Sequence, residues 1–227
     1  MRDILLVDLD DTLLDFSKAE KEALEKVLVT YGIDNNEENH QKYYKINKDY
    51  WKKYELHQIK RESLLGKRFE DFFDLFNKKV DGDKVNELYF SYLSEGAYLI
   101  DNALEFCEKC KKDGYKLIIV SNGVGSVQKP RIEKSGLKKY FDRIYLSEEV
   151  GYNKPDIEFY TRVLLDYYQQ ERMVMIGDSL SSDIQGGINF NIPTIWYNPN
   201  HLKSDLPNFE VDNLMDIFKI LEENLWK

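Results

Sequence analysis

Carboxylates stand where short apolar segments of the sequence end. Asp8 and Asp10 lie at the end of one such segment, and Asp178 and Asp183 follow another. The segments are too short for ordinary helices and rich in branched residues, which predicts buried strands. Ligands of an open parallel sheet bind beyond the carboxyl ends of its strands, so we expect polar residues at these ends to lie together. The residues expected at this edge are Asp8, Asp10, Ser121, Lys154, Asp178 and Asp183.

The charge at this edge requires compensation. Two like charges about 4 Å apart repel by ~4 kcal/mol at an effective dielectric constant of about 20. Oxygen ligands of this kind suit Mg²⁺, which keeps some of its waters and commonly bridges to a substrate phosphate. Four acids count as −4, and Mg²⁺ with Lys154 supplies +3, which leaves −1. The sequence therefore predicts a required metal.

Each residue alone has a simpler interpretation. A single Asp at a strand end is commonly a turn former or a helix N-cap. Ser121 alone fits a turn hydroxyl, Lys154 a solvated surface lysine, and Asp183 an acid on a helix face. None of these interpretations explains why all of them converge on one edge.

The order of the segments predicts the fold. Apolar strand-like runs alternate with stretches of helical spacing, which indicates right-handed crossovers and a parallel sheet covered on both faces. We therefore expect an α/β fold with a Rossmann-like doubly wound parallel sheet, closed by an amphipathic helix. The expected strands are Ile4 to Leu9, Lys116 to Ser121, Arg143 to Ser147, Met173 to Gly177 and Thr194 to Tyr197. The expected helices are Asn102 to Lys112, Ser126 to Lys139, Pro155 to Tyr168, Leu180 to Phe190 and Leu214 to Leu225.

One connection is too long for this pattern. Roughly 85 residues follow the first strand before the next core helix, and a structureless loop of that length is improbable in a compact domain. Residues 17–95 instead show helical spacing and many aromatics, with breakers at Gly32, Gly66 and Gly82. We expect an inserted helical cap of about four helices over residues 15–95, and a core formed by residues 1–14 and 96–227.

Composition narrows the class of protein. The 227 residues are 42% hydrophobic and 14% aromatic, which is ample for a packed core. The net charge of −9 repels polyanions, so we expect no nucleic-acid polymer as a partner. No secretory or membrane-spanning run is apparent, and the two cysteines, Cys107 and Cys110, fit reduced thiols inside a helix. These features predict a cytoplasmic protein without a membrane partner.

Four motifs resemble those of the haloacid dehalogenase superfamily of phosphohydrolases. They are Asp8-Leu9-Asp10-Asp11-Thr12-Leu13, Ser121-Asn122-Gly123, Lys154-Pro155, and Gly177-Asp178 followed by Asp183. A helical insert after the first motif is similar to the first cap type of that superfamily. Within the superfamily, the sequence resembles most the bacterial pyrimidine 5′-nucleotidase branch. The residues that carry this resemblance are Ile46-Asn47-Lys48 with Trp51, Lys67-Arg68-Phe69-Glu70 and Ser147-Glu148-Glu149-Val150-Gly151. Asp11 stands where many members carry Gly.

The resemblance implies a role for each matching residue. Asp8 would attack phosphorus and form an aspartyl phosphate, and Asp10 would act as general acid and then as general base. The substrate phosphate would be held by Thr12, Ser121, Asn122 and Lys154. Mg²⁺ would be bound by Asp8, the backbone carbonyl of Asp10, and Asp178, with Asp183 orienting a metal-bound water or Lys154.

The branch resemblance also implies a substrate, a pyrimidine nucleoside 5′-monophosphate. Asn47, Trp51 and Arg68 in the cap could stack a base and hydrogen-bond to its edge, although a helical cap also needs aromatics for its own core. We expect a small-molecule phosphomonoester as substrate and a monomer or homodimer.

Other functions share parts of this pattern. A receiver-like phosphoacceptor module also gathers acids, a hydroxyl and a lysine around Mg²⁺, but the large insert and the Asp-x-Asp spacing disfavour it. A 2-haloacid dehalogenase needs no metal, which Asp10 and Asp178 argue against. A phosphatase or mutase acting on a sugar phosphate or another small metabolite has the same core motifs and stays open.

Overall fold

The computed structural model describes residues 3–165, 167 and 172–225, and the chain forms two compact units. One unit is Met1–Phe16 together with Ala97–Lys227, and the other is Ser17–Gly96. We refer to them as the core and the cap.

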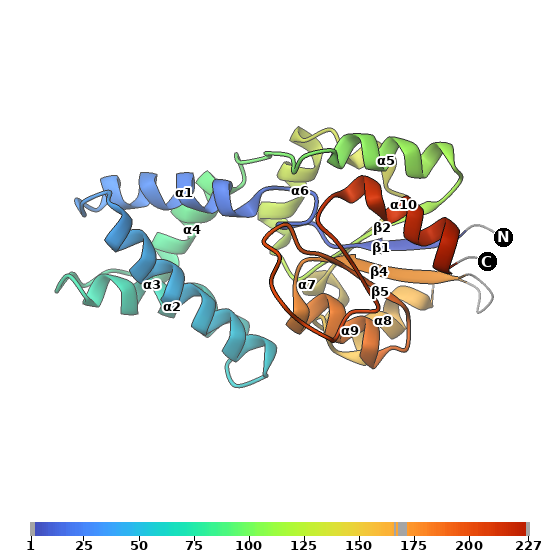
Figure 1. Cartoon of the computed structure of the whole chain (residues 1–227). Helices are drawn as coiled ribbons and strands as arrows, with labels where there is room; N and C mark the ends of the chain where they lie inside the picture. The colour runs from blue at the N-terminus through green and yellow to red at the C-terminus, as the bar shows by residue number, and fades with distance from the viewer. Residues whose placement is uncertain (1–2, 166, 168–171, 226–227) are drawn as a thin grey trace. The chain divides into compact units, whose positions relative to one another are not determined.

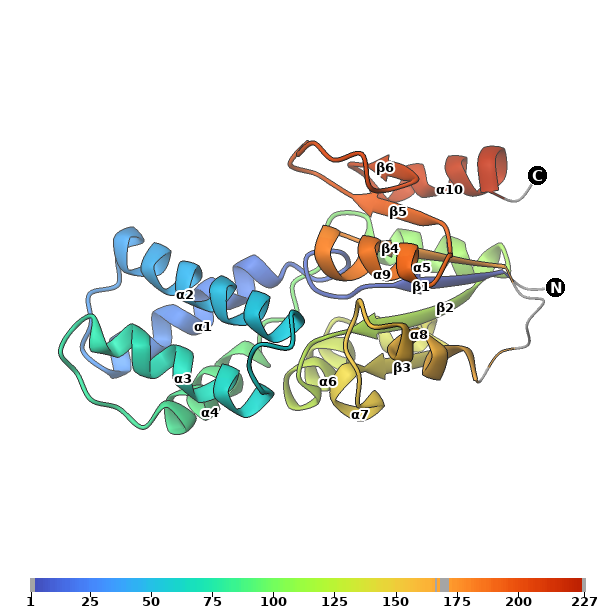
Figure 2. The same ribbon diagram turned by 90° about the horizontal axis from the view of Figure 1, so that it is seen from below.

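The core contains a parallel sheet of six strands in the order β3-β2-β1-β4-β5-β6 (Figures 1 and 2). From β1 the chain first adds β2 and β3 on one side and then β4, β5 and β6 on the other. The gap between β1 and β4, where the strand order reverses, is the switch point of a doubly wound sheet. The expected α/β fold is therefore confirmed. The strands are β1 (Ile4–Val7), β2 (Lys116–Ser121), β3 (Arg143–Leu146), β4 (Met173–Gly177), β5 (Thr194–Tyr197) and β6 (Phe209–Val211).

Alternate residues of each central strand pack against opposite layers of helices. Leu5 and Val7 of β1 face one layer, formed by α5 (Ala103–Lys112), α6 (Gly125–Lys134) and α10 (Ile217–Ile220). Ile4 and Leu6 face the other, formed by α8 (Ile157–Leu164) and α9 (Gln185–Asn189). Burial on both faces explains why the strands are almost wholly apolar and end only where polar residues begin.

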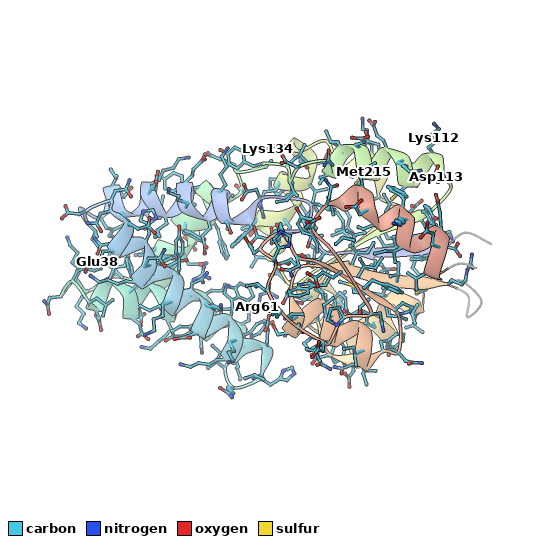
Figure 3. All side chains as sticks on the ribbon, viewed as in Figure 1. Glu38, Arg61, Lys112, Asp113, Lys134 and Met215 are labelled. Carbon is cyan, nitrogen blue, oxygen red and sulfur yellow. The ribbon has the colours of Figure 1, made fainter. Side chains whose placement is uncertain are left out.

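The helices of the core are shorter than the sequence spacing predicts. The helix expected over residues 126–139 ends at Lys134, because Gly136 takes a φ of +74° that terminates it, and a short 3-10 turn follows at Lys138–Tyr140. Lys134 at this end, and Lys112 and Asp113 at the end of α5, are labelled in Figure 3.

Other boundaries also differ from expectation, and β1 ends at Val7 rather than at Leu9. Ser147 begins a short helix, α7 (Ser147–Val150), rather than ending β3. A π-helical turn, Leu180–Ile184, precedes α9. The closing helix is divided into a 3-10 turn (Leu214–Asp216), α10 and a π-helical turn (Leu221–Leu225). The edge strand β6 was not predicted, because three residues give too little periodicity to recognise. The end of the helix expected over residues 155–168 lies partly outside the described residues.

The cap is built from four helices, as the sequence predicts. They are α1 (Phe16–Thr30), α2 (Glu37–Glu55), α3 (Arg61–Asp74) and α4 (Gly82–Leu93). An aromatic cluster forms their common interior, in which Tyr43 stacks on Phe69 with ring centroids 5.3 Å apart. Only Gly32 among the expected breakers has a positive φ, of +61°.

Gly66 and Gly82 instead allow α3 and α4 to approach closely. Gly66 lies inside α3, and a Cβ atom on Gly82 would come within 2.3 Å of the backbone oxygen of Gly66. Both glycines serve packing. The prediction that Gly66 breaks a helix was wrong, whereas Gly82 lies at a helix boundary as predicted, because α4 begins there. Among the described residues, no helix has the length and apolarity needed to cross a membrane.

Candidate active site

Asp8 and Asp178 follow the two adjacent strands at the switch point. The backbone N–H of Asp8 donates to Ile176 on the neighbouring strand at 2.9 Å, which fixes where Asp8 leaves the sheet. Thr12 lies between the two acids. Its hydroxyl oxygen is 3.3 Å from Asp8 Oδ2 and accepts a bond of 3.1 Å from the backbone N–H of Asp178. The indole of Trp196 on β5 donates to the backbone oxygen of Asp178 at 2.7 Å and fixes that residue from the other side.

The chain turns sharply after Asp8. The backbone N–H groups of Leu13 and Leu14 both donate to the backbone oxygen of Leu9, and Asp11 takes a φ of +55°. Asp tolerates this left-handed conformation better than most residues because its short side chain can bond locally. The turn therefore explains why Gly or Asp suits this position.

Lys154 is the cation at the centre of the site. Its ammonium group donates to Asp8 Oδ1 at 2.5 Å, to Asp183 Oδ1 at 2.7 Å and to the backbone oxygen of Val120 at 2.7 Å, which uses all three protons. Its side chain is 1% exposed. Burial lowers the pKa of Lys154, but Asp183 and Asp8 outweigh burial and raise it overall. Lys154 therefore stays charged beside both acids.

Ser121 and Asn122 end β2 next to Lys154. The Asn122 side chain donates to the backbone oxygen of Lys154 and accepts from its backbone N–H, both at 2.9 Å. Those amide atoms are thus occupied in placing Lys154. The hydroxyl of Ser121 is buried and accepts from the backbone N–H of Gly123 at 3.0 Å, which leaves its own proton to donate.

Asp183 is placed by the turn after β4. Its Oδ1 bonds Lys154, and its Oδ2 accepts from the backbone N–H of Ser179 at 3.1 Å. A Cβ atom on Gly177 would come within 2.2 Å of Asp183 Oδ2, so this approach requires glycine. Asp183 therefore joins Lys154 to the turn after β4 through its two carboxylate oxygens.

Asp8, Asp178 and Asp183 form a cluster with the donors of a hard cation. Ligand atoms of the three all lie within 4.8 Å of one another. Burial, and then repulsion from Asp183, raises the pKa of Asp8 to about 7, against the lowering effect of Lys154. Burial, and then repulsion from Asp8 and Asp183, also raises the pKa of Asp178 well above its ordinary value. A divalent cation bound to Asp8 and Asp178 would relieve both penalties, so the donor set fits Mg²⁺.

The side chain of Asp10 has partners that were not predicted. Arg131 Nη1 lies 2.5 Å from Asp10 Oδ1, and the Gln128 amide donates to Asp10 Oδ2. The sequence-based charge count of −1 omitted Arg131 and is corrected to zero, since its guanidinium adds +1 to the four acids, Lys154 and Mg²⁺. Only the spacing of Gln128 and Arg131 on one helix face after β2 could have indicated them, and that spacing is equally typical of a surface helix.

The three cap residues expected at the substrate differ in burial: Asn47 and Arg68 lie inside the cap, whereas Trp51 is partly exposed. Asn47 and Arg68 are both buried, and Arg68 Nη1 donates to Asn47 Oδ1 at 2.8 Å. Asn47 donates in turn to Glu20 at 2.8 Å, and Arg68 Nη2 donates to Asn86 at 2.9 Å. These hydrogen bonds therefore connect all four helices of the cap, because Glu20 lies in α1, Asn47 in α2, Arg68 in α3 and Asn86 in α4. Trp51 is half-buried, with its ring edge-on to Tyr54 at 6.0 Å.

The switch point of this sheet, with its buried acids and lysine, has the architecture of a phosphate-ester site in a doubly wound α/β protein. Comparison with known proteins agrees. The family model described as "Haloacid dehalogenase-like hydrolase" matches residues 5–197. The chain belongs to this family, and the aspartate cluster places it among the family's phosphohydrolases.

Three relatives match over nearly the full length. Pyrimidine 5′-nucleotidase PynA of Streptococcus pneumoniae is 36% identical over 226 residues, which cover 97% of this chain and 95% of PynA. Pyrimidine 5′-nucleotidase YjjG of Escherichia coli is 30% identical, covering 96% of this chain and 97% of YjjG. A crystal structure of the HAD-hydrolase YfnB of Bacillus subtilis, described as bound to magnesium, is similar with a TM-score of 0.91 and 32% identity. That match covers 97% of this chain and 98% of YfnB.

Proposed function

We propose that this protein is a Mg²⁺-dependent phosphomonoester hydrolase that cleaves pyrimidine nucleoside 5′-monophosphates through an aspartyl phosphate on Asp8. The observation that carries the proposal is the environment of Asp8. It is a buried carboxylate with Lys154 on one oxygen and the Thr12 hydroxyl near the other, two residues before a second acid. Phosphoryl transfer needs this combination of an aligned nucleophile and nearby positive charge.

The first half-reaction forms the phosphoenzyme. A carboxylate oxygen of Asp8 bonds to phosphorus while the bond from phosphorus to the ester oxygen breaks, and Asp10 gives its proton to that oxygen. In the second half, Asp10 takes a proton from water as the water oxygen bonds to phosphorus and the bond to Asp8 breaks. The products are an alcohol and inorganic phosphate, and both acids return to their starting states.

The other residues of the site hold the phosphoryl group. Lys154 would neutralise one of its oxygens as a point charge, and the hydroxyls of Ser121 and Thr12 would donate to others. Asn122 would act through Lys154, whose backbone it bonds on both sides. Asp8, the backbone carbonyl of Asp10, and Asp178 would hold Mg²⁺, which neutralises phosphoryl charge when bound. The magnesium in YfnB supports this choice of metal.

Two observations support a nucleotide as substrate. PynA and YjjG are both pyrimidine 5′-nucleotidases and match this chain from end to end. Trp51 also offers a partly exposed aromatic face, and stacking of a base on such a face contributes ~1–3 kcal/mol. Asn47 and Arg68 support the cap from within by the hydrogen bonds described above. We expect the enzyme to act in the cytoplasm on small molecules, as a monomer or homodimer.

The test is a phosphate-release screen with Mg²⁺ over nucleoside monophosphates, sugar phosphates and phosphorylated acids. We expect UMP and dTMP to be hydrolysed with the highest kcat/KM. A preference for sugar phosphates over every nucleotide would contradict the substrate assignment and leave the hydrolase class standing. Stoichiometric phosphorylation without turnover would favour a receiver-like module, and halide release from a 2-haloacid would favour a dehalogenase.

Trp51→Ala tests the base-stacking role. The variant should lower kcat/KM for UMP by roughly tenfold, as loss of about 1.4 kcal/mol of stacking requires. Trp51→Phe is the matched control because it keeps an aromatic face, and p-nitrophenyl phosphate is the control substrate because it has no base. An equal loss for UMP and p-nitrophenyl phosphate would show that Trp51 serves cap packing instead.

A further inference from the structure

Two side chains of α6 hold the carboxylate of Asp10 from both sides. Arg131 Nη1 lies 2.5 Å from Asp10 Oδ1, and the Gln128 side-chain amide donates to Asp10 Oδ2. The Gln128 Oε1 atom accepts from Arg131 Nη1 at 2.9 Å, so the three side chains form a closed ring of hydrogen bonds. Gln128 and Arg131 are 1% and 0% exposed, whereas the Asp10 side chain is 26% exposed. The two helix residues thus form a buried support, and the acid alone reaches solvent.

The backbone around α6 is shaped to allow these contacts. A Cβ atom on Gly123 would lie within 2.0 Å of Gln128 Nε2, so only glycine leaves room for the amide in this position. The start of α6 is held by Glu148, whose Oε2 accepts from the backbone N–H of Gly125 at 2.8 Å. Residues three apart on a helix share a face, which places Gln128 and Arg131 side by side. The ring therefore depends on a fixed helix and a specific glycine.

The two supports differ in strength. The guanidinium of Arg131 and the carboxylate of Asp10 are both charged, so their bond gains a Coulomb attraction that the neutral amide of Gln128 does not supply. Arg131 also lies over the ring of Phe16, with its guanidinium carbon 5.6 Å from the ring centre. Oδ1 of Asp10 is thus bound firmly, while the bond of Oδ2 to Gln128 is easier to exchange.

We propose that Arg131 and Gln128 are positioning residues that aim Oδ2 of Asp10 at the ester oxygen of the substrate. The inference rests on the proposed function, in which Asp10 is the general acid and base. When Asp10 is protonated on Oδ2, that oxygen leaves the Gln128 amide, to which it had been an acceptor, and donates to the ester oxygen. The proton passes to the ester oxygen as the phosphorus to ester-oxygen bond breaks and the bond to Asp8 forms. The resulting carboxylate stays bound to Arg131 through Oδ1, and Oδ2 accepts the proton of the hydrolytic water in the second half-reaction.

The test compares two leaving groups in Arg131→Met. An alkoxide such as that of UMP needs a proton to depart, whereas p-nitrophenolate does not. The value of kcat/KM reports the steps up to phosphorylation of Asp8, where the acid acts. We expect kcat/KM for UMP to fall roughly 100-fold, within the usual range for general acid catalysis, and that for p-nitrophenyl phosphate to fall no more than about threefold. Arg131→Lys should recover part of the loss with UMP, because it restores a cation.

Controls separate positioning from folding. Lys129→Met on the same helix removes an exposed cation and should change neither rate. Gln128→Met removes only the amide and should lower kcat/KM for UMP by roughly three- to tenfold, with less effect on p-nitrophenyl phosphate, in keeping with a partial loss of acid catalysis. This second variant keeps the inference testable if Arg131→Met fails to fold. Equal losses for both substrates in each folded variant would overturn it.

A double-mutant cycle with Asp10→Asn tests whether Arg131 acts through Asp10. If it does, Arg131→Met should add little to the loss already caused by Asp10→Asn with UMP. Losses that multiply would overturn the positioning role. If Asp10→Asn alone leaves the UMP rate unchanged, the proposed mechanism itself fails. If Asp10→Asn abolishes activity and Arg131→Met has no effect, only the positioning role fails.

Discussion

Replacing Lys154 with Met removes the charge at the centre of the site and nearly preserves its volume. The ammonium group has bonds of 2.5 and 2.7 Å to Asp8 and Asp183 and is 1% exposed. Met has a similar unbranched stem, so little cavity forms and the change is electrostatic. Breaking a buried ion pair by removing one partner costs about 3–5 kcal/mol, because the remaining charge has no compensation.

The loss of stability should grow with pH. In the metal-free protein Lys154 lowers the pKa of Asp8, which burial and Asp183 nevertheless raise to about 7. Without Lys154 the pKa of Asp8 rises further. A carboxyl whose folded pKa is raised favours folding at low pH, and that contribution is lost as pH rises through the folded pKa. At pH 5.5, which is below the pKa of Asp8 in both proteins, the carboxyl is protonated and no longer needs the cation. The difference in stability between the variant and the wild type should therefore be smaller at pH 5.5 than at pH 8.

The assay is urea unfolding in EDTA, followed by circular dichroism at pH 5.5 and 8. We expect Lys154→Met to lose about 3–5 kcal/mol at pH 8 and less at pH 5.5. Lys129→Met removes a surface partner of Glu149 and should cost less than about 1 kcal/mol at either pH. A loss for Lys154→Met below about 1 kcal/mol at pH 8, or a larger loss at pH 5.5, would show that Lys154 does not compensate the buried charge of Asp8.

Three other results are expected. Asp11→Gly should keep activity and stability because φ at this position is +55°. Asp11→Val should lower the free energy of unfolding by roughly 1–2 kcal/mol in thermal or urea unfolding, and equal stability of the two variants would contradict the role of the left-handed turn. Gly82→Ala should destabilise the cap, measured by limited proteolysis, because its Cβ would meet Gly66 at 2.3 Å, whereas unchanged protease resistance would contradict this packing. Mg²⁺ should bind more tightly at pH 8 than at pH 6 in calorimetry and should release protons near pH 7, because the metal competes with the proton on Asp8. A Mg²⁺ affinity that is independent of pH would count against the Asp8 carboxylate as a ligand.

The features of this protein that could be predicted from its sequence are those in which a local hydrophobic pattern is directly followed by residues able to do chemistry. Apolar runs ending in Asp8 and Asp178 identify both the strands and the site. Strands buried on both faces are apolar along their length, and ligands bind where such strands end. The helical cap was predictable from its spacing and aromatics. Strands β2, β4 and β5 were predicted with the bounds that the structure shows.

The features that were missed depend on contacts between distant residues. Arg131 is 121 positions from Asp10, and its position within a helix gives no sign that its guanidinium is buried. Gly66 was interpreted as a breaker because the closeness of α3 and α4 cannot be read from either helix alone. The bond of Arg68 to Asn47 joins two helices and was likewise not predicted, while contact of these residues with a base stays a prediction.

The most direct test of the central claim is to identify the residue that receives the phosphoryl group. Mixing the Mg²⁺-loaded protein with UMP, quenching with acid within one turnover and sequencing its peptides by mass spectrometry should place a phosphoryl group on Asp8. With p-nitrophenyl phosphate, whose leaving group needs no proton, Asp10→Asn should increase this species by slowing its hydrolysis. Asp8→Asn should abolish it together with turnover. Full turnover by folded Asp8→Asn, or a phosphoryl group on another residue, would contradict the account.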